Sequence, residues 1–98
     1  MTDVFLSYSR KDKVFVRRLF EGLKTTGRDA WVDWESIPYS VEWWMEICAG
    51  IEQADNFLFI VSQHSLASKI CNDELAYART HNKRIIPIIR QQVNVQKD

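Results

Sequence analysis

The sequence predicts an α/β fold in which a parallel sheet carries helices on both faces. Short apolar segments alternate with segments of helical periodicity along the 98 residues. Residues 57–61, FLFIV, form an unbroken apolar run that ends in β-branched residues, which is typical of a strand buried on both faces. A polar stretch at residues 62–68 separates this run from a helical pattern that opens at Ile70. We therefore expect residues 57–61 to lie at the centre of the sheet.

The composition predicts one globular domain across residues 1–98. Hydrophobic residues make up 46% of the chain, enough for the core of a small fold. Thirteen basic residues balance thirteen acidic ones, so no net field favours nucleic acid or an anionic membrane as a partner. Neither a run of membrane-spanning length nor a signal-peptide pattern is present, and we expect a cytoplasmic protein.

The cysteines, histidines and glycines argue against several kinds of site. Cys48 and Cys71 lie in helical patterns beside apolar residues, which favours reduced core thiols over a disulfide framework. His64 and His81 are far apart and lack the acids or cysteines that would complete a metal site. The three glycines are not clustered, so neither a dinucleotide-binding fingerprint nor a phosphate loop is present. We expect no metal ion.

Residues 3–9 predict the first strand, which becomes polar from Ser7 at its carboxyl end. Ser9 can cap the helix that follows, with Asp12 three residues later. Apolar residues then recur at helical spacing on one face: Phe15, Val16, Leu19, Phe20 and Leu23. Gly27 lies where this helix would end.

Residues 30–33 predict a short second strand, and an aromatic loop containing Pro38 follows it. The next apolar stripe predicts a second helix and consists of Trp44, Ile47, Cys48, Ile51 and Ala54. This spacing directs Trp43 and Glu46 away from the centre of the stripe. Residues 84–89 predict a fourth strand, and Pro87 places it at or near an edge of the sheet because proline cannot donate a ladder hydrogen bond.

The regular alternation of strands and helices favours a flavodoxin-like order, in which the first and third strands are neighbours. Residues 7–10 and 62–64 would then flank one crevice outside the carboxyl ends of these strands. Glu74 lies early in the next helix and could overlook the same crevice. A phosphoacceptor receiver domain shares this architecture, but it needs acids where this chain has Ser7 and Ser62.

A lone carboxylate limits the chemistry of such a crevice. Sugar glycosidases ordinarily use two carboxylates, because one must protonate the leaving oxygen. Nicotinamide leaves NAD as a neutral group from a cationic precursor, so one acid that stabilises an oxocarbenium-like ribose could suffice. By spacing alone, an acid such as Glu74 is more often a solvated acid on a helix surface, and tryptophans such as Trp34 and Trp43 more often serve packing or an interface.

Four ordered segments resemble the signatures of Toll/interleukin-1 receptor (TIR) domains of the prokaryotic type. These are residues 3–9, DVFLSYS; residues 31–33, WVD, leading into the BB loop around Pro38; residues 71–75, CNDEL; and residues 84–88, RIIPI. The resemblance covers about residues 3–89, and the order and gaps of the four segments make it specific.

The resemblance implies that Glu74 is the catalytic acid of an enzyme that hydrolyses NAD to nicotinamide and ADP-ribose or a cyclised form. NAD would be the substrate, with no further cofactor. Substrate contacts are implied for Ser9, Arg10 and Glu35, with Tyr8 and Trp34 as adjacent candidates.

The same resemblance implies self-association with other TIR domains, for signalling in immunity, stress or antiviral defence. The candidate interface residues are Pro38, Tyr39 and Trp43. A scaffold that only binds other TIR domains is the alternative function. An unrelated flavodoxin-like binder of a small molecule is a remote third possibility.

Two departures from the family pattern affect these expectations. Ile70 stands where many catalytic members have Trp, so a stacking surface would be absent or supplied by Trp34 or Trp43. The family also continues past the fourth strand with a fifth strand and a last helix, which we expect to be missing here. An uncovered fourth strand would favour pairing between chains.

Overall fold

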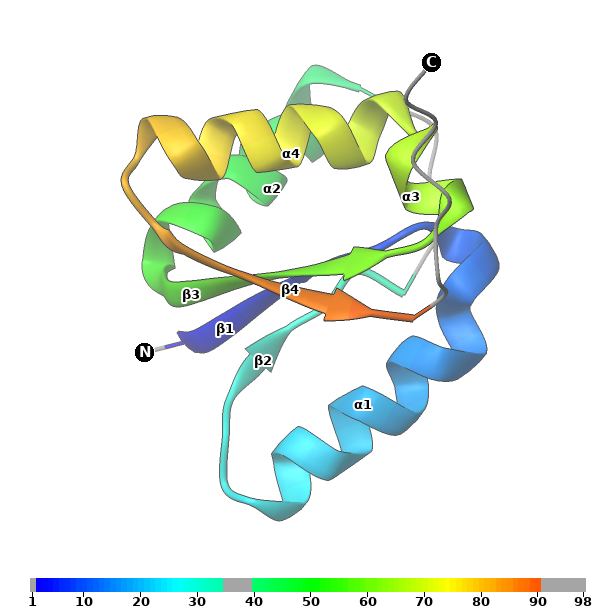
Figure 1. Ribbon diagram of the computed structural model, residues 1–98. Coiled ribbons are helices and arrows are strands. Elements are labelled where there is room, and N and C mark those ends of the chain that lie inside the picture. Colours follow the sequence, from blue (N-terminus) through cyan, green and yellow to red (C-terminus); the bar gives the residue numbers. More distant parts are fainter. Residues whose placement is uncertain (1, 35–39, 91–98) are drawn as a thin grey trace.

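The computed structural model describes residues 2–34 and 40–90 and contains a four-stranded parallel sheet in the order β2-β1-β3-β4. The strands are β1 (Thr2–Ser7), β2 (Ala30–Trp31), β3 (Ala54–Val61) and β4 (Arg84–Ile89). The predicted fold class is confirmed, since β1 and β3 are neighbours at the centre of the sheet and β4 forms an edge. Figure 1 shows this arrangement.

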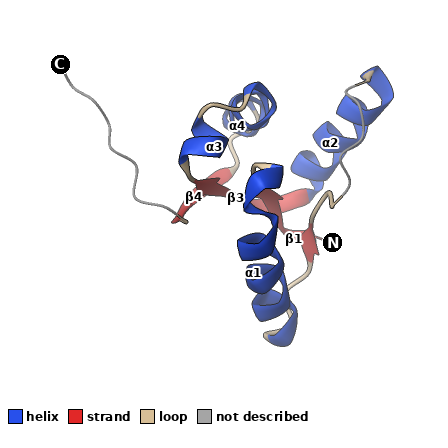
Figure 2. Ribbon diagram, turned by 90° about the vertical axis from the view of Figure 1, so that its right-hand side faces the viewer, coloured by secondary structure: helices blue, strands red, loops and turns tan. Residues whose placement is uncertain are grey.

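Helices cover both faces of the sheet. A 3₁₀ turn at Arg10–Asp12 leads into α1 (Lys13–Thr25), which covers one face. The helices α2 (Val41–Gln53) and α4 (Lys69–Thr80) lie together on the other face, and the short α3 (Gln63–Leu66) precedes α4. Figures 1 and 2 both place α1 across the sheet from α2 and α4. Each helix in the described ranges is too short or too polar to cross a membrane.

The side chains of β1 and β3 alternate between two core clusters. Phe5 pairs in register with Phe57, and their rings stack at 5.5 Å on the side of α2 and α4. Trp31 continues this stack at 4.7 Å from Phe5. On the side of α1, Leu6 and Val16 belong to a second cluster. The central strands are therefore buried on both faces, as their apolar sequence predicts.

Individual residues next to the helices determine where the helices begin and end. Three serine hydroxyls cap helix starts by accepting backbone N–H groups: Ser40 for α2, Ser62 for α3 and Ser68 for α4. The backbone of Gly27 has φ +83°, and its N–H donates to the carbonyl of Lys24 just after α1 ends. Gly27 therefore terminates α1 as expected.

Three local predictions are wrong. The second strand ends at Trp31 rather than Asp33, and Ala54 opens β3 instead of closing α2. Trp43, expected to point away from the apolar stripe, is 8% exposed within the core. The buried face of α2 runs through Trp43, Ile47 and Gly50, because Gly50 lets the helix approach the Trp31 ring closely.

Gly50→Ala should destabilise the fold by about 1–2 kcal/mol. A Cβ at position 50 would lie 2.9 Å from Cε2 of the Trp31 indole. The Trp31 ring cannot move away from this Cβ freely, because it is stacked on Phe5. Urea unfolding monitored by tryptophan fluorescence measures the loss. Gly22→Ala is the matched control, because its Cβ would meet no atom within 4 Å, and an equal loss in both variants would contradict this account.

Candidate active site

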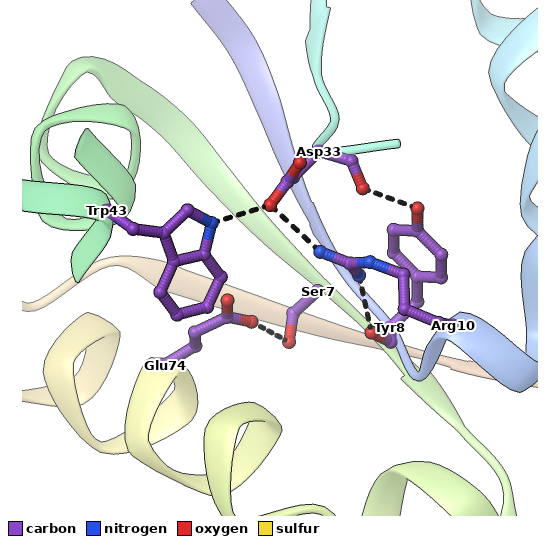
Figure 3. Close-up of polar contacts among 6 residues, drawn as sticks. All are labelled: Ser7, Tyr8, Arg10, Asp33, Trp43 and Glu74. Carbon is purple, nitrogen blue, oxygen red and sulfur yellow. Dashed lines mark hydrogen bonds and ion pairs between the residues drawn. The ribbon is translucent and has the colours of Figure 1, made fainter. Parts of the chain in front are cut away.

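A buried serine–glutamate pair lies at the carboxyl end of β1. Ser7 is the last residue of β1 and is fully buried, and Glu74 on α4 is 5% exposed. The Ser7 hydroxyl donates a 2.8 Å hydrogen bond to Oε1 of Glu74 (Figure 3). The start of α4 at Lys69, capped by Ser68, places Glu74 on the helix face that meets the sheet. The predicted position of Glu74 near the strand ends is therefore correct.

Burial gives Glu74 an unusual protonation equilibrium. Loss of hydration raises its pKa from 4.5 to about 7, and the hydrogen bond from Ser7 and the positive charge of Arg10 oppose this rise. Both the neutral and the ionised carboxyl are therefore populated at neutral pH. A carboxyl group poised in this way can stabilise positive charge or exchange a proton with a ligand.

Asp33 joins the residues around this pair and is the main site residue that the sequence did not single out. Its Oδ2 accepts hydrogen bonds from the Trp43 indole and from the Arg10 guanidinium, both at 2.9 Å. Its backbone carbonyl accepts the Tyr8 hydroxyl at 2.6 Å. Figure 3 shows Asp33 between these three side chains, with Glu74 and Trp43 pointing toward the same space. The sequence feature that could have identified Asp33 as a site residue is its position as a carboxylate directly after a short strand, within the WVD segment.

The aromatic candidates Tyr8 and Trp34 lie on the side of the sheet that α1 covers. Tyr8 is 3% exposed, its ring meets Trp34 edge-on at 6.1 Å, and Arg10 lies 4.6 Å above it. Arg17 of α1 covers the Trp34 ring at 4.7 Å. Tyr8 therefore holds the loop after β1 in place, while Trp34 is partly exposed. Their predicted contacts with substrate remain predictions.

The other predicted site residues are distributed as follows. Ser9 caps the 3₁₀ turn by accepting the N–H of Lys11 at 3.2 Å. Three candidates, Glu35, Pro38 and Tyr39, lie outside the described residues. Trp43 is buried against the core, and its predicted role in an interface between chains remains a prediction.

A second buried acid, Asp12, lies on the opposite side of the sheet from Glu74. The Ser62 hydroxyl at the end of β3 donates to Oδ2 of Asp12 at 2.5 Å, and Arg90 lies 4.0 Å from its other oxygen. Asp12 follows the capping residue Ser9 by three positions and precedes α1 directly, but its side chain makes no capping hydrogen bond to α1. This contact ties the loop after β1 to the end of β3.

A pocket of about 380 Å³ opens beside the hydrogen-bonded pair of Asp33 and Trp43. The pocket is lined by residues that follow β2 and by the first half of α2: Trp31, Val32, Asp33, Trp34, Trp43, Glu46 and Ile47. Indole rings and carboxylates form the walls together, a lining that suits a ligand with flat rings and polar groups. Within residues 2–34 and 40–90, no three His, Cys, Asp or Glu side chains gather as metal ligands.

Comparison with known proteins relates this arrangement to one family. The sequence model of the TIR domain matches residues 4–98, whereas no curated protein matches the chain significantly. The TIR domain of the Toll-related receptor TRR-2 from Hydra magnipapillata superimposes with a TM-score of 0.84 at 22% identity, over 98% of this chain and 76% of that one.

Two further structures share the fold. The TIR domains of the activated Roq1 resistosome, which recognises the pathogen effector XopQ, align with a TM-score of 0.72 at 24% identity. The alignment covers 91% of this chain and 57% of the Roq1 chain. The CMP N-glycosidase BcmB of Clostridium botulinum aligns with a TM-score of 0.70 at 19% identity, over 97% and 74% of the two chains. Because the family match spans residues 4–98, this chain belongs to the TIR domain family.

Proposed function

We propose that this TIR domain cleaves the bond between nicotinamide and ribose in NAD, with Glu74 as the catalytic carboxylate. The observation that carries the proposal is the buried Ser7–Glu74 pair at the carboxyl end of β1, where open parallel sheets bind their ligands. The likeness in fold to a CMP N-glycosidase adds support, because that enzyme also acts on a nucleotide substrate. Nicotinamide and ADP-ribose, or a cyclised form, would be the products.

The chemistry requires only one acid. When the glycosidic C–N bond breaks, its electron pair moves to the pyridinium nitrogen, and nicotinamide leaves as a neutral molecule. The ribose carbon becomes oxocarbenium-like, and an ionised carboxylate placed beside it stabilises this charge. Water then attacks the carbon and loses a proton, which Glu74 can accept because its pKa is about 7. Attack by an adenine nitrogen instead of water would give the cyclised product.

We propose roles for the other predicted residues from the contacts that they make around Glu74. Arg10 presents a guanidinium that could pair with a substrate phosphate, and Asp33 holds this group in place. Trp34 lines the 380 Å³ pocket and offers a flat surface for a nicotinamide or adenine ring. Ile70 is partly buried against the core. Trp43, which points toward the same space as Glu74 (Figure 3), and Trp34, which lines the pocket, are therefore the candidate stacking surfaces.

Replacing Glu74 by Gln is expected to reduce nicotinamide release by about 100-fold or more, because the amide cannot carry the stabilising negative charge. The measurement is chromatography of nicotinamide after incubation of concentrated protein with NAD. Asp73→Asn is the matched control, since this neighbouring acid on α4 pairs with Lys69 at the surface. Full activity in Glu74→Gln, or no nicotinamide from the wild type, would overturn the proposal.

A scaffold that binds other TIR domains without chemistry is the second candidate. It is favoured by large apolar side chains at the surface of α2, where Val41 is 69% and Met45 64% exposed. The same incubation separates the two functions. Under the scaffold function, NAD would stay intact at every protein concentration.

A further inference from the structure

Ser7 is a polar residue at a position where the strand pattern predicts an apolar one. The side chains of β1 alternate between the two faces of the sheet, so Ser7 points to the same face as Phe5, toward α2 and α4. Ser7 is fully buried there, and its backbone is in register with Phe59 of the central strand β3. A buried hydroxyl is costly unless it is hydrogen-bonded. The presence of a serine at this position is therefore explained by its partner, Glu74.

The two oxygens of the Glu74 carboxyl have different surroundings. Oε1 accepts the Ser7 hydroxyl at 2.8 Å. Within residues 2–34 and 40–90, this is the one hydrogen bond that the carboxyl makes, and every fully buried polar side-chain atom has a partner. Oε2 therefore keeps contact with the surface. Figure 3 shows Oε2 turned away from Ser7, toward the space that Trp43 also faces.

We infer that Ser7 is a positioning residue, which holds Oε1 of Glu74 against the sheet and thereby presents Oε2 to the ribose of the substrate. The inference rests on the proposed cleavage of NAD. Free rotation about the last torsion of a glutamate side chain would exchange its two oxygens. A donor fixed in a central strand opposes this exchange, so Oε2 is held where positive charge develops on the ribose. The same oxygen would accept the proton that the attacking water loses.

Ser7 also affects the protonation of Glu74, together with the charged groups around the carboxyl. Burial raises the pKa of Glu74 to about 7, and the hydrogen bond from Ser7 is the largest influence that lowers it. The positive charge of Arg10 also lowers this pKa, whereas Asp33 after β2 and Asp73 on α4 raise it. Three groups near the carboxyl stay protonated at neutral pH, because burial raises the pKa of each: Tyr8, Cys48 and Cys71. Removal of the Ser7 hydroxyl should therefore raise the pKa of Glu74 further.

The pH dependence of nicotinamide release in the wild type, Ser7→Ala and Ser7→Thr tests the inference. In the wild type, the rate should rise with pH through about 7 as Glu74 ionises. Ser7→Ala should move this midpoint upward by about one pH unit and lower kcat at high pH by about 10-fold, with KM changed by less than about 2-fold. Ser7→Thr keeps a hydroxyl and should keep the wild-type midpoint. A serine with a merely structural role would leave the midpoint in place when it is replaced by alanine.

Ser65→Ala is the matched control for the loss of a buried hydroxyl. Ser65 is also fully buried, but its hydroxyl donates to the backbone carbonyl of Ser62, on the other side of the sheet from Glu74. This variant should lose stability without any shift of the midpoint. Circular dichroism checks that each variant is folded.

NMR of labelled glutamate carboxyl carbons measures the titration of Glu74 without substrate, and its signal is the one that Glu74→Gln lacks. Equal midpoints in the wild type and Ser7→Ala would overturn the role of Ser7, even if the wild type releases nicotinamide. A wild type that releases no nicotinamide, although its Glu74 signal responds to Ser7→Ala, would instead overturn the proposed function and the role of Oε2 with it. The two failures are therefore distinguishable.

Discussion

Above pH 7, the free energy of unfolding of Glu74→Gln is expected to be about 3 kcal/mol higher than that of the wild type. Near pH 4 the two proteins should be about equally stable. The gain arises because the buried carboxylate is costly to ionise in the folded chain, whereas an amide stays neutral at every pH. The amide oxygen can still accept the hydrogen bond that Ser7 donates to Glu74.

The sign follows from the direction of the pKa shift. The pKa of Glu74 is about 7 in the folded chain and 4.5 when exposed, so between these values the folded state holds more protons than the unfolded state. The free energy of unfolding of the wild type therefore falls as pH rises through this window, by about 3 kcal/mol in total. In Glu74→Gln this contribution is removed.

Urea unfolding at several pH values between 4 and 8 measures the difference. Glu21→Gln on the exposed face of α1 is the matched control and should differ from the wild type by less than about 0.5 kcal/mol throughout. A difference between Glu74→Gln and wild type that stays constant with pH would show that burial does not perturb this carboxyl. Combined with the nicotinamide assay, a variant that is more stable but inactive would separate the catalytic role of Glu74 from a structural one.

Asp33→Ala should cost about 2–3 kcal/mol of stability. The Trp43 indole N–H is buried with the core and loses the acceptor that it contacts at 2.9 Å. The Arg10 contact adds less, because that side chain is 30% exposed and solvent screens the pair. Asp33→Asn should cost less than Asp33→Ala, since an amide oxygen can still accept from the indole.

Unfolding curves and the emission maximum of tryptophan report this change. Asp55→Ala removes an exposed carboxylate from β3 and is the matched control, with an expected change below about 0.5 kcal/mol. If Asp33→Ala and Asp55→Ala were equally stable, Asp33 would not hold Trp43 and Arg10 together. In the proposed enzyme, Asp33→Ala should also weaken NAD binding through a displaced Arg10.

The order of the strands and the place of Glu74 could be predicted from the sequence because both depend on local patterns. An apolar run of five residues determines that β3 is buried on both faces, and Pro87 marks β4 as an edge strand. A serine cap at Ser68 and the distance from it to Glu74 determine which helix turn carries the acid. Four short segments in the right order were enough to identify the TIR family.

Only the tertiary structure decided which side chains meet. The spacing of apolar residues pointed Trp43 outward, yet α2 packs with Gly50 against the Trp31 ring, and in this packing Trp43 is buried and donates to Asp33. Ser7 and Glu74 are 67 positions apart, so their bond depends on how α4 packs on the sheet. The raised pKa of Glu74 arises from that packing, because hydration is lost only when the whole fold surrounds the carboxyl. Local sequence thus determined the elements and the acid, and long-range packing determined the acid's partner and its proton affinity.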